Sequence, residues 1–339
     1  MDLASIVEWV LKSIILIFVL LTGFAYLTFY ERKALARIQV RIGPNRAGPG
    51  GWMQPVADGV KLIFKEELIP AQAYKTVFIL APIITVVPAL IITAVIPWGG
   101  TVNLFGRQVG LYISDLNVGI LYIMSVASIS VYGIVLAGWS SNNKYAMMGG
   151  LRSSAQMISY ELALGLSFIG PILLAGSMSI TDIVNAQRNV WYVFLQPLGF
   201  VIYLIASLAE VNRAPFDMPE AEQELTAGYH TEYSGMKFAL FYMGEYIKMI
   251  AVSSIAASLF LGGFRAPFGN LFPILDAPIL GPVWLFLKVF VLLFGMIWVR
   301  ATLPRIRYDK LMAFGWKIML PAALINIFGT AVVLVLVGG

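Results

Sequence analysis

The sequence of 339 residues contains no cysteine and a single histidine, His230. The lack of cysteine excludes disulfides, thiolate-held iron–sulfur clusters and cysteine-based zinc sites within this chain. One histidine cannot supply both axial ligands of a bis-histidine haem. We therefore expect the chain to bind no metal and to carry no redox centre of its own.

Charge is also scarce. Asp, Glu, Lys and Arg make up 12% of the residues, hydrophobic residues make up 59%, and the mean hydropathy is +0.83. Soluble domains carry about twice this share of charge. An all-α integral membrane protein fits this composition, because a helix satisfies its own backbone hydrogen bonds in lipid. Eight apolar stretches are about long enough to cross a bilayer, and they cover residues 14–30, 77–97, 118–139, 157–175, 190–209, 236–264, 283–301 and 314–337.

The start of the chain does not look like a cleaved secretory signal. Asp2 and Glu8 precede the first apolar stretch, where a signal peptide carries basic residues. We expect the first span to be retained.

The distribution of lysine and arginine predicts the orientation. The loops after the second, fourth and sixth spans hold one each, namely Arg107, Arg188 and Arg265, and the loops after the odd-numbered spans hold most of the others. Positively charged loops stay in the cytoplasm. Both termini are therefore predicted to lie outside, with cytoplasmic loops at about 31–76, 140–156, 210–235 and 302–313.

The chain shows no internal repeat and no low-complexity linker, so residues 1–339 are predicted to form a single transmembrane domain. Within the first loop, Trp52, Val56, Val60 and Ile63 fall on one helical face, and the opposite face is polar. This pattern predicts a short amphipathic helix at the membrane interface.

Four ionisable residues lie well inside predicted spans: Glu161, Glu245, Lys248 and Lys288. A charge at this depth is costly, and it usually faces a polar interior. Lys288 is expected to reach toward the membrane surface. Glu245 and Lys248 are three residues apart and could form an ion pair. Glu161 has no cation in its own helix, which favours a proton-relay role.

A third of the acidic residues gather in one loop and its flanks. Residues 210–233 hold six of the 18 acids of the chain, namely Glu210, Asp217, Glu220, Glu222, Glu224 and Glu232. Asp217 and Pro219 could begin a helix, but a helix start explains only two or three of these acids. Clustered carboxylates with coupled protonation could store or pass protons. Arg213, the lone arginine among them, is expected to pair with Glu210 or Asp217. The "GPN" and "GPGG" segments of the first loop are interpreted as turns, because a phosphate site would need a flanking strand, helix and lysine.

These loops resemble a known family. The resemblance rests on three segments, "YERKALARIQVRIGPNRAGPGGWMQPVADGVKLIFKE" (30–66), "AEVNRAPFDMPEAEQELTAGYHTEYSGMKFALFYMGEY" (209–246) and "RATLPRIRYDKLMAFGWK" (300–317). They are similar to the signatures of the quinone-channel membrane subunit of respiratory complex I, the proton-translocating NADH:quinone oxidoreductase. The similarity also covers residues 137–161. Ala36 and Lys310 depart from the family pattern, where glycine and glutamine are usual, but no charged motif residue is lost.

The resemblance implies an eight-helix subunit of a bacterial inner-membrane complex, multi-pass and with both termini periplasmic. Quinone would be the substrate, and the iron–sulfur clusters and FMN would lie in partner subunits. The partners implied are the peripheral quinone-site and iron–sulfur subunits, the antiporter-like and small membrane-arm subunits, quinone and the lipid bilayer, with no nucleic acid. The residues that match the quinone channel and docking surface are Glu31, Arg32, Lys33, Gln39, Arg41, Trp52, Asp58, Arg213, Phe216 and Asp217. Those that match the proton path are Glu161, Glu210, Glu220, Glu222, Glu224 and Glu245.

Two alternatives stay open at this point. The chain could serve a related membrane-bound hydrogenase or a ferredoxin- or deazaflavin-dependent dehydrogenase, which share a homologous subunit. It could also be an autonomous secondary transporter, although such folds often show inverted repeats, and none is visible here.

Overall fold

The computed structural model describes residues 3–104, 107–217, 228–267 and 276–338. The long helices are α1 (Leu3–Ile38), α3 (Lys75–Ile92), α4 (Gly119–Ser140), α5 (Lys144–Ala175), α10 (Gly235–Phe260), α11 (Gly281–Thr302) and α13 (Leu320–Gly338). The shorter ones are α2 (Gln54–Phe64), α6 (Ile180–Ala186), α7 (Tyr192–Leu195), α8 (Pro197–Glu210) and α12 (Tyr308–Phe314). The described residues also form 3₁₀ turns at Pro49–Gly51, Thr93–Val95, Gly228–His230 and Pro278–Leu280 and a π-helical turn at Gly315–Met319.

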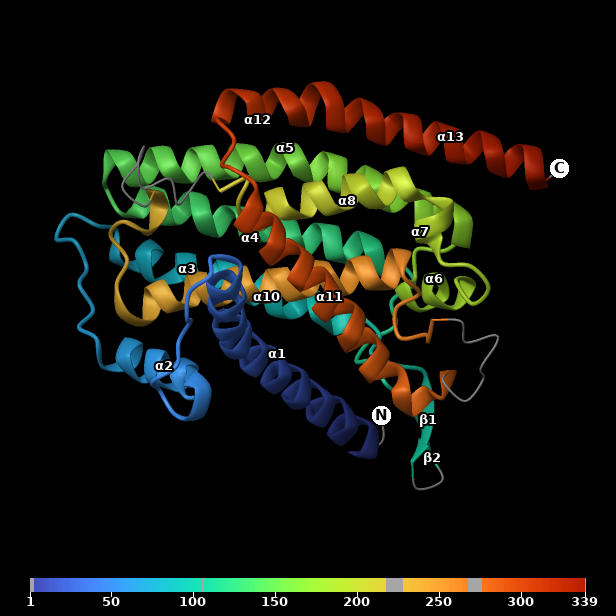
Figure 1. The fold of residues 1–339 in the computed structure, drawn as a ribbon, viewed down its shortest axis with the longest axis horizontal. Coiled ribbons are helices and arrows are strands. Elements are labelled where there is room, and N and C mark those ends of the chain that lie inside the picture. Colours follow the sequence, from blue (N-terminus) through green and yellow to red (C-terminus); the bar gives the residue numbers. More distant parts are fainter. Residues whose placement is uncertain (1–2, 105–106, 218–227, 268–275, 339) are drawn as a thin grey trace.

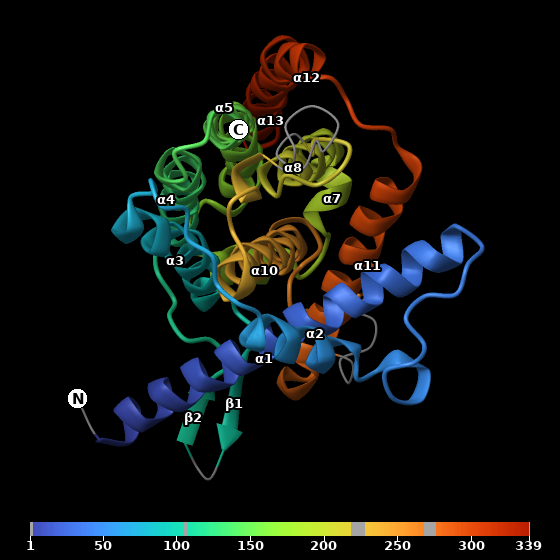
Figure 2. The same ribbon diagram turned by 90° about the vertical axis from the view of Figure 1, so that its left-hand side faces the viewer.

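Helices α3, α4, α5, α8 and α10 run side by side and form the body of the molecule (Figures 1 and 2). Helix α13 lies along α5 and α8, whereas α1 and α11 cross the bundle at an angle. The contact between α3 and α4 depends on Gly133, because a Cβ at this position would collide with Thr85 Oγ1. Small residues let membrane helices approach closely in this way.

Within the described part of the chain, seven helices are long and apolar enough to cross a membrane. The chain is therefore a multi-pass membrane protein, as the composition predicted. The predicted span at 190–209 is divided into α7 and α8, because Gln196 leaves the helical conformation directly before Pro197. Helix α8 alone has 14 residues, a length of about 21 Å.

The two ends of the bundle differ. Helix α2 and the described segment before α10 (residues 228–234) lie toward one end, while both termini, α6 and a β-hairpin lie toward the other (Figure 1). The hairpin pairs β1 (Thr101–Leu104) with β2 (Arg107–Gly110), with Val102 opposite Val109. This hairpin was not predicted from the sequence.

The predicted amphipathic helix is present as α2. Its described residues include no buried one, and Trp52, Val56, Val60 and Ile63 are all exposed. The apolar face therefore points away from the bundle, where it is available to lipid or to a partner.

Candidate functional site

The site is organised by the way α8 ends. Asn212 adopts the left-handed conformation with φ 55°. The amide of Arg213 donates to Leu208 O at 3.2 Å, and the amide of Asn212 donates to Ala209 O at 3.3 Å. This pattern is a Schellman motif, in which asparagine tolerates the left-handed position better than most residues. The chain turns sharply, and the side chain of Arg213 becomes buried.

Gln156 of α5 holds the turned segment in place. Its side-chain amide is fully buried and donates to Ala209 O at 2.8 Å and to Phe216 O at 2.7 Å. From the other side, the amide of Ile306 donates to Pro215 O at 3.1 Å. Residues 209–216 are thus fixed between α5 and the segment after α11.

Arg213 lies at the centre of a buried ion-pair cluster. Its guanidinium is 3.4 Å from Glu31 of α1 and 2.5 Å from Glu245 of α10. It also stacks over the ring of Tyr246, with 4.4 Å between the guanidinium carbon and the ring centroid. Arg300 of α11 forms a second ion pair with Glu31. Helices α1, α10 and α11 thus meet at this cluster, and α1 is far from the other two in sequence.

A separate ion pair, between Asp217 and Arg305, adjoins the cluster. Asp217 is buried and pairs with the more exposed Arg305 at 2.9 Å. Phe216 is buried beside Tyr160, with ring centroids 5.5 Å apart. The hydroxyl of Tyr160 donates to Leu311 O at 2.9 Å, which ties this region to α12.

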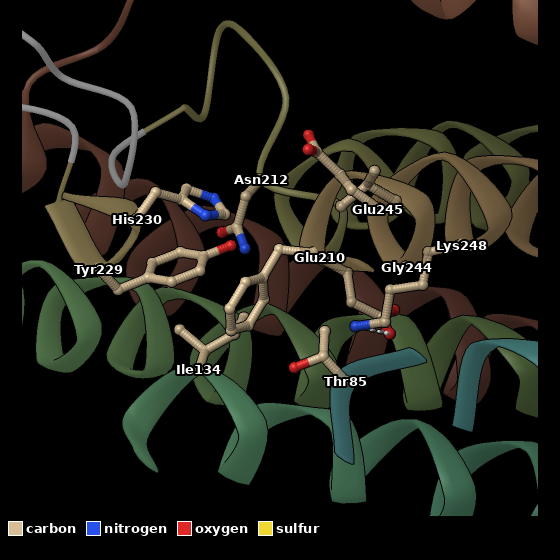
Figure 3. A pocket seen from close by; sticks show the side chains of 11 residues that line it. Thr85, Ile134, Glu210, Asn212, Tyr229, His230, Gly244, Glu245 and Lys248 are labelled. Atoms are coloured by element: carbon tan, nitrogen blue, oxygen red, sulfur yellow. Dashed lines mark ion pairs between the residues drawn. The ribbon is translucent and has the colours of Figure 1, made fainter. Parts of the chain in front are cut away.

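Figure 3 shows a cavity beside this cluster, with Glu245 common to both. Glu210 from α8 and Lys248 from α10 face each other across 3.9 Å, while Glu245 points away from both. The cavity has a volume of about 20 Å³, which is enough space for a water molecule. Glu161 of α5 accepts a hydrogen bond from Ser128 and is close enough to Glu210 to interact electrostatically.

His230 also borders this cavity. It is buried among the rings of Tyr229, Phe238, Phe241 and Tyr242. Burial lowers the pKa of His230 to about 3, because the apolar surroundings disfavour the charged imidazolium. The imidazole is therefore neutral at physiological pH.

The predicted residues of the first loop form a separate, more exposed group. Arg32 pairs with Asp58 at 2.7 Å and so joins α1 to α2. Burial would raise the pKa of Asp58, but hydrogen bonding and charge from Arg32 outweigh it and lower that pKa. Trp52 packs against Phe29 of α1, and the ammonium of Lys33 lies over the same Phe29 ring.

Gln39 and Arg41 lie beyond the end of α1, and both are exposed. Arg41 Nε donates to Gln39 Oε1 at 2.8 Å. Neither residue contacts the buried cluster through a described hydrogen bond or ion pair. Glu220, Glu222 and Glu224, together with the helix predicted to begin at Asp217, lie outside the described residues.

The ion pairs differ from those expected from sequence. Arg213 was expected to pair with Glu210 or Asp217, yet among the described residues its ion pairs are with Glu31 and Glu245. The possible pair between Glu245 and Lys248 is replaced by Lys248 with Glu210, since the two α10 side chains point in different directions.

The expectation for Lys288 was wrong. Its side chain is buried, and its ammonium donates to the carbonyls of Leu261, Gly263 and Arg265 at 2.6, 2.8 and 2.7 Å. These carbonyls follow the end of α10 and have lost the helical donors that would otherwise satisfy them. Backbone carbonyls inside the protein therefore bind the ammonium of Lys288, which does not need to reach the membrane surface.

Arg300, Arg305, Ser128 and Gln156 were not predicted from the sequence. The two arginines belong to a basic segment that indicated only orientation and family. Nothing in the sequence pairs them with particular acids. Among the described residues, no group of three or more His, Asp or Glu side chains could hold a metal ion.

Comparison with known proteins gives a consistent result. Residues 11–331 match the profile of a family described as NADH dehydrogenase. The H subunit of the NADH-quinone oxidoreductase of Protochlamydia amoebophila is 53% identical over 310 residues, which cover 91% of this chain and 92% of the relative. A protein of the same description from Thermomicrobium roseum is 48% identical over 343 residues, covering 98% of both chains. An H subunit of the NADH-quinone oxidoreductase of Geobacter sulfurreducens is 52% identical over 332 residues, covering 94% of this chain and 92% of the relative.

Proposed function

Because this chain belongs to the NADH dehydrogenase family and is similar over its length to the H subunits of NADH-quinone oxidoreductases, we propose that it is the quinone-channel subunit of a respiratory complex I. In this proposal the chain forms a quinone chamber together with peripheral subunits. It couples the reduction of quinone in that chamber to proton translocation. FMN and iron–sulfur clusters of partner subunits supply the electrons, since this chain has no cysteine to hold a cluster.

The observation that carries the proposal is the position of Arg213. Its guanidinium contacts Glu31 on one side and Glu245, within a helix of membrane-spanning length, on the other. Glu31 also binds Arg300. A change of charge at this end of the bundle, such as the reduction of a quinone, would act directly on an intramembrane carboxylate.

The wall of the quinone chamber is proposed to include Glu31, Arg213, Phe216 and Asp217, which the structure brings close together. Arg32, Lys33, Gln39, Arg41, Trp52 and Asp58 would line the approach to the chamber and the surface that docks the peripheral arm. The exposed apolar face of α2 supports this part of the proposal, because a quinone tail or lipid can cover it.

The proton path is proposed to run through Glu210, Glu161 and Glu245. These carboxylates come from α8, α5 and α10, and each is buried or half-buried within an apolar helix. Charged groups in such positions commonly mark ion or proton pathways. Glu220, Glu222 and Glu224 would extend the path toward the chamber.

In a bacterial inner membrane, α7 and α8 together would complete an eighth crossing. The 19 residues from Tyr192 to Glu210 would span about 28 Å if they were continuously helical. An even number of crossings agrees with both termini lying toward one end of the bundle, the periplasmic end in this proposal (Figure 1). The remaining complex I subunits would dock at the opposite end and along the exposed helices.

The proposal is tested by Glu161→Gln and Glu245→Gln in the assembled complex, in inverted membrane vesicles. We expect the number of protons pumped per quinone reduced to fall about tenfold or more, because a glutamine cannot relay a proton. Asp182→Asn, an exposed acid near the opposite end, is the control. Unchanged quinone reduction together with unchanged pumping in both glutamine variants would contradict the proton path.

The chamber is tested separately with Arg213→Ala and Asp217→Asn. Both variants should slow quinone turnover, because they remove a charge from the proposed chamber wall. Normal turnover in both would remove these residues from the chamber and leave the proton path as a separate question.

A further inference from the structure

Lys248 is a buried cation in the middle of the proposed proton path. It lies on α10, a helix of membrane-spanning length, and its side chain is 7% exposed. Its Nζ atom is 3.9 Å from Glu210 Oε1, and the Glu210 side chain is equally buried. A buried charge in a membrane-spanning helix costs free energy, and residues that carry such a charge usually have a functional role.

The surroundings of Lys248 are acidic on several sides. Glu210 of α8, Glu161 of α5 and Glu245 of α10 itself all interact with it electrostatically. Helix α3 contributes the neutral Thr85, and the turn before α10 contributes the neutral His230 to the same cavity (Figure 3). The ammonium group thus pairs with Glu210 and lies within electrostatic range of two further carboxylates.

The distance between Lys248 and Glu210 is longer than in a tight structural ion pair. Charge-assisted N–H···O bonds measure about 2.7 to 2.9 Å, whereas Nζ and Oε1 are 3.9 Å apart. The adjoining cavity of about 20 Å³ has room for a water molecule that bridges polar groups. This geometry allows a proton to pass between the two side chains through one bridging water.

We propose that Lys248 is a proton-exchanging residue of the path and passes protons to Glu210. The proton leaves Nζ for the Glu210 carboxylate, which becomes a neutral acid while the amine keeps its lone pair. A proton from the acid form of another carboxyl group of the path then restores the ammonium and leaves that group as a carboxylate. The inference rests on the proposed function, because it adds a member to the proton path.

Lysine and arginine differ in whether the side chain can release a proton. A lysine amine can release its proton when it is buried, but a guanidinium remains charged in proteins. If Lys248 only balances the charge of Glu210, arginine should replace it. If Lys248 exchanges protons, arginine should hold the charge and still block the path.

The test uses Lys248→Arg and Lys248→Met in the whole complex, in inverted vesicles, normalised to the amount of assembled enzyme. The readout is the number of protons pumped per quinone reduced. We expect this ratio to fall about tenfold or more in both variants. Lys237→Arg and Lys237→Met are matched controls on the same helix, because Lys237 pairs with the half-exposed Glu67, and they should keep the ratio.

A pumping ratio in Lys248→Arg within twofold of the unmodified complex would overturn the inference. If Lys248→Met fails to assemble, the double variant Lys248→Met with Glu210→Gln removes both members of the ion pair, so that neither is left buried without the other. This double variant should assemble without pumping, and normal pumping in it would equally overturn the inference.

If Glu161→Gln and Glu245→Gln abolish pumping but Lys248→Arg does not, the inference fails while the proposed function stands. If those glutamine variants pump normally, the proposed function itself fails.

Discussion

Glu31→Gln is the most informative single change in the buried cluster. Glu31 is 3% exposed and neutralises part of the charge of Arg213 and Arg300. Glutamine keeps the shape of the side chain but removes the negative charge. Arg213 would then keep Glu245 as an ion-pair partner at 2.5 Å, and Arg300 would lose its pair with position 31.

The size of the effect follows from the geometry. Two unit charges 3.4 Å apart, as in Glu31 and Arg213, attract by about 5 kcal/mol at an effective dielectric constant of about 20. Removing one partner of a buried pair typically costs about 3 to 5 kcal/mol. Because Arg213 keeps Glu245 and Arg300 is partly exposed to water, we expect a loss of about 3 kcal/mol in the free energy of unfolding.

The assay is an SDS titration of the detergent-solubilised chain, followed by tryptophan fluorescence. Asp309→Asn is the control, because Asp309 forms an ion pair with Arg307 in which the two side chains are 69% and 77% exposed. An exposed pair of this kind contributes about 1 kcal/mol or less. If Glu31→Gln destabilises the chain no more than Asp309→Asn does, the reasoning about the buried cluster is wrong.

Two further changes test other features of the fold. His230 takes up a proton below its ordinary pKa of 6.5 in the unfolded chain, but only near a pKa of about 3 in the folded chain. The folded state is therefore destabilised as the pH falls from 6.5 toward 3. The loss is about 2 kcal/mol at pH 5, and His230→Phe should remove this part of the pH dependence of unfolding; equal pH dependence in both proteins would contradict it. Val40 is 94% exposed and has φ 56°, so Val40→Gly should raise the free energy of unfolding by about 1 kcal/mol. Ile38→Gly, within α1, should lower it in the same titration, and equal signs for the two would refute the strain argument.

The helices were largely predictable because hydrophobicity alone selects them. A stretch of apolar residues long enough to cross a bilayer folds as a helix wherever it occurs in such a chain. The amphipathic period of α2 was equally clear. The division of the predicted span at Gln196 and Pro197 was not predicted. The apolar stretch continues through these residues, but the backbone cannot stay helical at the residue before the proline.

The site was predictable in its residue types but not in its pairings. The acidic loop and the intramembrane acids were visible as unusual charges in an apolar chain. The partners of these acids depend on tertiary packing, as Glu31 and Arg300 show, being 269 positions apart in sequence. Glu245 and Lys248 are three residues apart and looked like a local ion pair, yet Glu245 pairs with Arg213 and Lys248 pairs with Glu210.

The arrangement of charges explains how a chain with so few of them could transmit a signal over a distance. Arg213 lies between Glu31 and Glu245, and Lys248 lies within electrostatic range of Glu245, Glu210 and Glu161. Arg213 is shared between two acids, so neutralising Glu31 leaves Glu245 as its remaining described ion-pair partner. For Lys248 and Glu210, whose charged atoms are 3.9 Å apart, the loss of one charge changes the energy of the other by about 4 kcal/mol at an effective dielectric constant of about 20. That exceeds thermal energy several-fold, so under the proposed function the loss of one charge within these ion pairs is felt by its partner without any movement of a helix.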